Sequence, residues 1–422
     1  MSAPVVVVGA GPAGLAAAIE LRRRDVAGVL VLDREREPGG IPRHAAHQGF
    51  GARDLRRALS GPEYARRYAT LARAAGAEIR TEAMVTGWTA DGALEVTSPS
   101  GRERIDPAAV ILATGCRERP RAARLVPGSR PAGVMTTGTL QQHVRLRGER
   151  VGTSAVVVGA EHVSFSAVAM LAEGGARTVA MVTAAPRHES FPAFRAGAAL
   201  RYRTPLHTRT AVTRIEGRER VAAVELTDLD SGATRRVACD TVVFTADWIP
   251  EHELAALAGI ALDAGTRGPA VDAALRTDRP GVFAAGNLLH GAEAADVAAL
   301  SGRHAGAAVA AYVAGRAPWP AARVPVRCAP PLRWIVPNAI AAGTHPAFPP
   351  PRGRFAVRAY AFLRAAQLTV RQDRRTLWAG RLPSLRPGRS AALPAGWTGA
   401  VDPAGGAVEI AVARARLAQP LV

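Results

Sequence analysis

The N-terminal residues show a short apolar run, a helical stretch and a second apolar run in succession. Val5 to Val8 is apolar throughout, and an Ala- and Leu-rich stretch continues to Arg24. Val29 to Asp33 is the second run and ends on an acid. Apolar runs of this length on either side of a helix are typical of parallel strands buried on both faces. The pattern predicts a βαβ unit.

The same alternation returns further along the chain. Residues 155–158 are apolar, and a helical stretch separates them from residues 178–182. Residues 240–245 and 282–285 are again mostly apolar, and a helical pattern over about 292–313 follows the second of them. Repeated alternation of strands and helices predicts an α/β fold built on parallel sheets.

The pattern changes after Gly315. Prolines become frequent between residues 318 and 351, which is typical of a linker with extended segments. Beyond them, residues 355–370 and 408–412 show short apolar alternations. Alternation with a period of two indicates half-buried strands. We therefore expect residues 317–422 to form a Pro-rich linker and a small β-rich module.

A glycine pattern lies between the first apolar run and the helical stretch. Residues 9–14 read Gly-Ala-Gly-Pro-Ala-Gly, and Asp33 follows Gly14 by about 20 positions. In a dinucleotide-binding turn, Gly9 permits the tight turn, Gly11 lets the backbone approach a pyrophosphate, and Gly14 lets the helix pack against the strand. The pyrophosphate lies at the helix N-terminus, where free N–H groups and the helix dipole favour negative charge. Asp33 would accept a hydrogen bond from a ribose hydroxyl.

The charge balance changes which chemistry is possible. The chain has 54 basic and 35 acidic residues, a formal charge of +19, and every basic residue is arginine. Without lysine, a pyridoxal Schiff base and a Walker-type phosphate loop are excluded. The arginines are interleaved with Ala, Glu and Pro, and only 5% of residues are aromatic. No stacking platform for bases is recognisable, so we expect no nucleic-acid partner.

Cysteine spacing excludes a further set of sites. Cys116, Cys239 and Cys328 lie far apart, and no C-x-x-C occurs. A redox dithiol, a zinc knuckle and a Cys₄ iron–sulfur cluster are therefore not expected, and no metal site is assigned. Neither a signal-peptide pattern nor an apolar run of about 18 residues is present. We expect a cytoplasmic protein with no membrane span.

Several segments together resemble a known family. They are residues 9–14, 37–40, 49–51, 61–64, 113–119 and 281–287. The chain resembles the FAD-dependent pyridine nucleotide-disulfide oxidoreductase superfamily over about residues 4–316. It is most similar to the NAD(P)/FAD-dependent oxidoreductases described with glycerol-3-phosphate, opine and cyanide-forming dehydrogenase systems. The missing C-x-x-C excludes the disulfide reduction for which the superfamily is named.

The resemblance implies two Rossmann-like dinucleotide-binding domains, the second inserted in the first. The FAD domain would comprise residues 1–118 and 263–316, and the inserted NAD(P)-type domain residues 119–262. Asn287 stands where the family commonly has an Asp, and an Asn can still bond a hydroxyl. The residues that the resemblance assigns to FAD are Gly9, Gly11, Pro12, Ala13, Gly14, Asp33, Arg34, Gly40, Val85, Thr114, Gly115, Gly286 and Asn287.

The glycine pattern of the second domain departs from the family. Residues 159–164 read Gly-Ala-Glu-His-Val-Ser, and Thr183 stands where an acid is expected. A Glu161 carboxylate about 4 Å from a pyrophosphate charge would cost about 4 kcal/mol at an effective dielectric near 20, almost a thousandfold in affinity. We expect weak or absent NAD(P) binding. The alternative is that Glu161 turns aside to an arginine and leaves the site usable.

Two histidines are the candidate catalytic residues. His44 and His47 follow the glycine pair at 39–40, where the family places residues around the flavin ring. They could act as acid and base during hydride transfer. A metal pair lacks obvious further ligands, and pocket-lining histidines with no catalytic duty are an equal alternative.

The leading hypothesis is a FAD-dependent dehydrogenase that passes a hydride from a small organic substrate to flavin. Electrons then leave to oxygen, a quinone-like or protein acceptor, or a partner redox subunit. One alternative is an NAD(P)H-dependent flavin reductase that feeds another protein. A further possibility is a non-catalytic accessory subunit that uses the FAD fold for assembly. Substrate identity and oligomeric state do not follow from the sequence.

Overall fold

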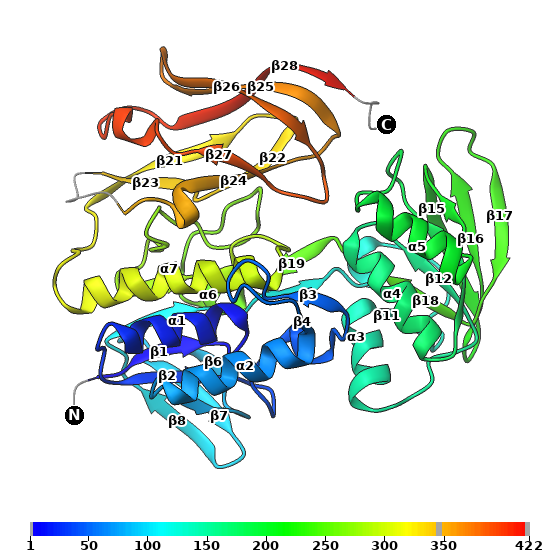
Figure 1. Cartoon of the computed structure of the whole chain (residues 1–422), viewed down its shortest axis with the longest axis horizontal. Coiled ribbons are helices and arrows are strands. Elements are labelled where there is room, and N and C mark those ends of the chain that lie inside the picture. The colour runs from blue at the N-terminus through cyan, green and yellow to red at the C-terminus, as the bar shows by residue number, and fades with distance from the viewer. Residues whose placement is uncertain (1–2, 343–347, 418–422) are drawn as a thin grey trace. The chain divides into compact units, whose positions relative to one another are not determined.

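The computed structural model describes residues 3–342 and 348–417 and divides the chain into two compact units (Figure 1). Unit 1 combines the residues up to Cys116 with those from Pro250 onward, and unit 2 is Arg117–Ile249. The chain crosses between the units in β10 (Cys116–Glu118) and β19 (Trp248–Pro250), which pair with each other. Within the described residues, no helix is long and apolar enough to span a membrane.

Unit 1 is built on a five-stranded sheet in which every pair of neighbours is parallel. In sheet order its strands are β20 (Val282–Ala284), β9 (Ala109–Leu112), β1 (Val5–Val8), β2 (Val29–Leu32) and β5 (Glu78–Arg80). In the sheet, β2 lies on one side of β1, whereas β9 and β20 lie on the other side of β1. The carboxyl end of β1 is therefore a topological switch point, where ligands of such sheets bind.

Helices α1 (Pro12–Arg23) and α7 (Ala295–Val313) lie side by side along this sheet (Figure 1). Their backbones approach closely because glycines face α1. A Cβ atom at Gly302 would overlap the Ala13 carbonyl oxygen, and one at Gly306 would lie 2.7 Å from the Ala17 carbonyl oxygen. The remaining elements of this part are α2 (Gly61–Ala74), α6 (Glu253–Leu257), β3 (Gln48–Phe50), β4 (Leu59–Ser60), and the antiparallel β6 (Met84–Trp88), β7 (Leu94–Ser98) and β8 (Gly101–Ile105).

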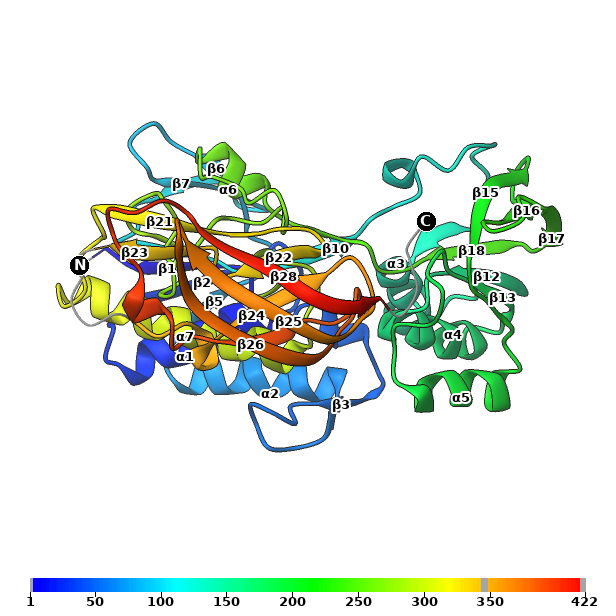
Figure 2. The same ribbon diagram turned by 90° about the horizontal axis from the view of Figure 1, so that it is seen from above.

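The C-terminal residues of unit 1 form two β-sheets around a common core. Figure 2 shows β25, β26 and β28 of the larger sheet side by side. Phe355 of one sheet and Leu368 and Ile410 of the other are fully buried in one cluster with Trp397. In chain order the strands are β21 (Ala322–Cys328), β22 (Leu332–Val336), β23 (Ala339–Ala342), β24 (Arg354–Ala359), β25 (Leu363–Gln372), β26 (Arg375–Leu385), β27 (Ala391–Pro394) and β28 (Val408–Leu417).

Unit 2 repeats the parallel architecture. Its sheet order is β11 (Val134–Thr136), β18 (Thr241–Phe244), β12 (Ser154–Val158), β13 (Arg177–Val182) and β14 (Leu206–His207). The other elements are α3 (Thr137–Gln141), α4 (His162–Glu173), α5 (Pro192–Tyr202), and an antiparallel sheet of β15 (Thr210–Gly217), β16 (Val221–Asp228) and β17 (Thr234–Ala238). The predicted α/β class is confirmed, and the β-rich C-terminal module is present.

The loop before α7 is packed against the C-terminal sheets. The His290 ring stacks on Trp334 with ring centroids 4.6 Å apart, and the Arg358 guanidinium donates to the Gly291 carbonyl at 2.8 Å. His290 is 8% exposed, and burial lowers its pKa to about 4. The imidazole is therefore neutral at neutral pH in the folded chain.

This burial makes the stability of unit 1 depend on pH. The unfolded chain takes up a proton on His290 near pH 6.5 and the folded chain only near pH 4, so stability is complete above about pH 6.5 and falls as the pH is lowered toward 4. The expected loss is at most about 3 kcal/mol. We expect His290→Gln to flatten this part of a plot of Tm against pH, with the exposed His47→Gln as control. Equal acid losses in both variants would contradict the assignment.

Candidate functional site

The turn between β1 and α1 contains three glycines, and a Cβ atom would fit at the middle one, Gly11, but not at Gly9 or Gly14. Gly9 has φ of +106°, and a Cβ atom there would lie 2.5 Å from the Ala113 carbonyl oxygen. A Cβ atom at Gly14 would overlap the Gly9 carbonyl oxygen. At Gly11, by contrast, a Cβ atom would meet nothing within 4 Å. The fold itself therefore requires Gly9 and Gly14, whereas Gly11 borders open space at the start of α1.

That open space has the electrostatics of an anion site. Gly11 is the N-cap of α1 and provides no side-chain cap, and Pro12 follows as the first helical residue. The N–H groups of the first turn and the positive end of the helix dipole are left for a ligand. A pyrophosphate fits this requirement, because its charge and acceptor oxygens match the uncapped helix end.

Two distant segments of unit 1 close around the same turn. A Cβ atom at Gly40 would lie 3.0 Å from the Gly11 Cα, and one at Gly286 would lie 2.6 Å from the Ala13 Cβ. Residues from the start, from position 40 and from position 286 thus meet at the N-terminus of α1. The structure brings Gly40 and Gly286, which the family resemblance assigns to FAD, to the turn at Gly11.

Asp33 directly follows β2 and lies beside this turn. Its carboxylate accepts from the Ala10 N–H at 2.5 Å and from the Glu35 N–H at 2.8 Å. Burial raises the pKa of Asp33, and these two hydrogen bonds oppose the rise. Each carboxylate oxygen keeps a lone pair that could accept a ribose hydroxyl. Arg34 lies next to it, mostly exposed, with Nη1 3.8 Å from Glu251 Oε2.

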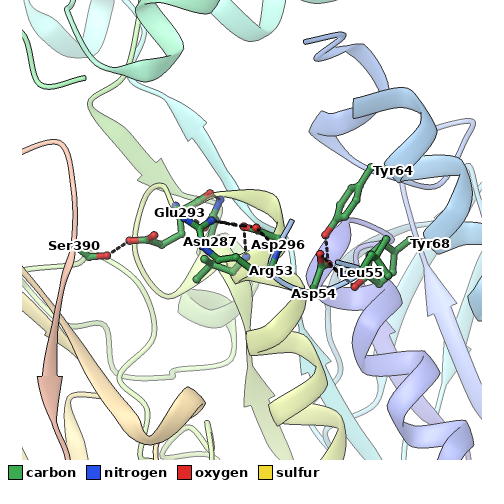
Figure 3. A network of polar contacts seen from close by, with 10 residues as sticks. Arg53, Asp54, Leu55, Tyr64, Tyr68, Asn287, Glu293, Asp296 and Ser390 are labelled. Atoms are coloured by element: carbon green, nitrogen blue, oxygen red, sulfur yellow. Dashed lines mark hydrogen bonds and ion pairs between the residues drawn. The ribbon is translucent and has the colours of Figure 1, made fainter. Parts of the chain in front are cut away.

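The other residues assigned to FAD differ in whether their side chains already make contacts within the chain. Val85 is buried in β6, and the Thr114 hydroxyl donates to the Glu251 carbonyl at 2.7 Å. Gly115 borders open space, as Gly11 does. The Asn287 amide pairs with the backbone of Glu293, donating at 3.1 Å and accepting at 2.9 Å (Figure 3). Contacts of all these residues with FAD stay predictions.

The two candidate catalytic histidines lie in unlike environments. His44 ends a short 3₁₀ helix and is 2% exposed. His47 is exposed, with Nδ1 3.1 Å from the Gln48 carbonyl oxygen and its ring 5.0 Å from that of Phe50. Their roles as acid and base stay predictions.

A polar network that sequence reasoning missed holds the loop at residues 51–57 (Figure 3). The Arg53 guanidinium donates to both oxygens of Asp296, at 2.9 and 3.1 Å, in the first turn of α7. Asp54 accepts from the hydroxyls of Tyr64 and Tyr68 on α2, each at 2.6 Å. Burial raises the pKa of both tyrosines, so they act as neutral donors. The motif at residues 61–64 pointed to this helix but not to these bonds.

In the equivalent turn of unit 2, side chains of the turn itself cap the N-terminus of the helix. Glu161 is the N-cap of α4, and its carboxylate accepts from the Ser164 N–H while the Ser164 hydroxyl accepts from the Glu161 N–H at 3.0 Å. The Ser164 hydroxyl also lies 2.6 Å from the Thr245 hydroxyl. The carboxylate of Glu161 therefore lies at the N-terminus of α4, whereas no side chain caps the N-terminus of α1.

The next turn of unit 2 is held by arginines. The Arg124 guanidinium donates to the carbonyls of Thr245 and Ala246, at 2.7 and 2.8 Å. Arg119 pairs with Asp247 at 3.1 Å. These two arginines therefore stabilise the backbone that follows β18.

Two parallel sheets, each with a helix that starts at the end of its middle strand, define a protein with two dinucleotide-type folds. The pyridine nucleotide-disulphide oxidoreductase family matches residues 3–302. The chain belongs to this family. Cys239 and Cys328 form no disulfide within the part of the chain that the structure describes.

Among curated relatives, the alpha subunit of sarcosine oxidase from Corynebacterium sp. (strain P-1) is 34% identical over 215 residues, 47% of this chain and 21% of that protein. An opine oxidase subunit of Agrobacterium tumefaciens (strain Ach5) is 31% identical over 185 residues, 40% and 35% of the two chains. The chain thus spans well under half the length of both. The thioredoxin reductase of T. acidophilum shares the fold, with a TM-score of 0.60, 22% identity, and coverage of 73% of this chain and 97% of that one.

The open position at Gly11 leads to a direct test of cofactor binding. Gly11→Glu would place a carboxylate at the N-terminus of α1, as Glu161 does at α4, without a steric clash. We expect FAD affinity to fall by about a hundredfold or more, because a like charge would lie beside the pyrophosphate. The measurement is flavin absorbance of the purified protein and FAD titration of the apoprotein.

The matched control is Gly197→Glu in α5, where a Cβ atom also meets nothing within 4 Å. It should retain FAD, and both variants should keep the helical signal of the parent in circular dichroism. Full FAD occupancy in Gly11→Glu would show that the pyrophosphate does not lie at this helix end.

Proposed function

We propose that the flavin of this enzyme takes a hydride from a small organic substrate and passes its electrons to an acceptor or a partner subunit. The observation that supports this proposal is the carboxylate of Glu161 at the N-terminus of α4. The N-terminus that would receive FAD is uncapped, whereas the one that would receive NAD(P)H carries its own anion.

The size of the electrostatic effect favours a donor other than NAD(P)H. A carboxylate about 4 Å from a phosphate charge costs about 4 kcal/mol at an effective dielectric near 20, and solvent at a half-buried site reduces that figure. Even half of it lowers affinity by more than tenfold. A nicotinamide cofactor would also have to displace the hydrogen bond from the Ser164 N–H, which the carboxylate already accepts.

The residues of unit 1 have distinct roles in this proposal. FAD, when bound, supplies the hydride-accepting chemistry. The uncapped end of α1 holds the pyrophosphate, and Asp33 orients a ribose through its carboxylate. His44 and His47 are the candidates for moving the proton that accompanies hydride transfer. The pH profile of flavin reduction in His44→Gln and His47→Gln, compared with the parent, tests these roles.

The relatives support an assembly of more than one chain. The sarcosine oxidase and opine oxidase relatives are each named as one subunit of an oxidase. We infer that this chain, too, transfers electrons within an assembly.

Anaerobic reduction of the FAD-loaded protein distinguishes the possible functions. NADH, NADPH and a panel of small amines, amino acids and hydroxy acids are added in turn, and the flavin absorbance is followed. Bleaching by an organic donor supports the proposal. Rapid, complete bleaching by NADH or NADPH would overturn it in favour of a flavin reductase. A flavin that stays oxidised with every donor until a second protein is added would indicate an accessory subunit.

Neutralising the carboxylate gives a sharper version of this test. We expect Glu161→Gln to raise the rate of flavin reduction by NADH at least tenfold, because the charge disappears while the side-chain oxygen can still cap α4. Glu173→Gln, at the other end of α4, removes the same charge and should leave the rate unchanged. Identical NADH rates in the two variants would show that Glu161 does not control access.

A further inference from the structure

Unit 1 contains a cavity of about 430 Å³ between α7 with its preceding loop and the C-terminal sheets. Gly11 is not among its lining residues, and Ser301 in its wall accepts a hydrogen bond from the Gly286 N–H at 3.1 Å. Its charged and titratable lining residues are His290, Glu293, Arg352, Arg354, Arg386 and Arg389. They come from the loop before α7, from the segment entering β24, and from the segment between β26 and β27.

Positive charge dominates this cavity. Four arginines line the cavity with a single carboxylate, that of Glu293. This carboxylate already accepts from the Ser390 hydroxyl (Figure 3) and lies 3.7 Å from Arg358 Nη2. Within residues 3–342 and 348–417, the side chains of three of the four make no ion pair or hydrogen bond. These three are Arg352, Arg354 and Arg386. Three of the four cations therefore make no direct ion pair, although the charges of Asp296 and Glu293 act on Arg352 from a longer distance.

Repulsion among these cations is visible at Arg352. Burial lowers the pKa of its guanidinium, and the charges of Arg354 and Arg53 lower it further, while the charges of Asp296 and Glu293 oppose this. Arg352 also has φ of +61°, a backbone conformation that costs about 1 kcal/mol or more for a residue with a side chain. A fold that brings like charges together in this way gains most from an anion that lies between them.

The inner wall supplies different chemistry. His290 is 8% exposed, and its Nδ1 has no hydrogen-bond partner among the described residues. Val297, Pro351 and Pro383, which keep exposed surface, add apolar atoms to the same lining. Apolar surface beside several cations suits an organic anion better than a hydrated inorganic ion.

We propose that this cavity binds a small organic anion, with its carboxylate or phosphate group among the guanidinium groups of Arg352, Arg354 and Arg386 and its apolar body against Val297 and Pro351. The proposal does not depend on which donor reduces the flavin. Guanidinium groups bind either oxyanion through charge-assisted hydrogen bonds, so both anion classes share this chemistry.

Calorimetric titration of the FAD-loaded protein at low ionic strength tests the site. The probes are benzoate, phenyl phosphate and the uncharged benzamide. We expect saturable binding of at least one of the two anions and none of benzamide. The Arg354→Gln/Arg386→Gln double variant should bind that anion at least tenfold more weakly, because each lost charged hydrogen bond is worth about a factor of ten. Preference for benzoate or for phenyl phosphate identifies the anionic group.

The matched control is Arg374→Gln, in the exposed turn between β25 and β26 and outside the cavity lining. It removes one positive charge and should bind as the parent does. The single variant Arg386→Gln shows the effect if the double variant folds poorly. Three outcomes would overturn the proposal: no binding of either anion to the parent, equal binding by the parent and the arginine variants, or binding of benzamide as tight as that of benzoate.

Discussion

The close packing of α1 against β1 and α7 is the constraint on which the rest of unit 1 depends. It is possible only because side chains are absent at Gly14, Gly302 and Gly306, where a Cβ atom would meet backbone carbonyl groups. The contact places the N-terminus of α1 directly at the carboxyl end of the middle strand. From that point the other parts of the site follow, since Gly40 and Gly286 reach the same turn from distant segments.

The two dinucleotide-type folds show how little change is needed to alter such a site. At α1 the N-cap is a glycine without a side chain, and at α4 it is Glu161, whose carboxylate bonds its own helix. Ser164 replaces the third glycine of the motif and is accommodated because its hydroxyl bonds Thr245 at 2.6 Å. Unit 2 thus keeps the parallel sheet and its helix while the anion position at the helix end is filled from within.

The C-terminal sheets are more than an appended module. They bury the loop before α7 through the stacking of His290 on Trp334 and the hydrogen bonds of Arg358. The same loop carries Asn287, whose amide bonds Glu293, and so connects the expected FAD turn with the arginine-lined cavity. Packing of one β-rich region therefore determines the surroundings of a segment at the expected FAD turn.

The sequence by itself determined the local features: the βαβ units, the closed and open positions of the glycine turn, and the acid at the N-terminus of α4. These depend on short-range periodicity and on steric rules that act within a few residues. Only the tertiary structure decided that Arg53 pairs with Asp296, that Asp54 accepts from two tyrosines, that His44 is buried while His47 is exposed, and that residues 250–262 pack in unit 1. The sequence shows which residues are apolar or charged and therefore need a partner in the folded chain. Which distant residue becomes that partner depends on how the whole chain packs.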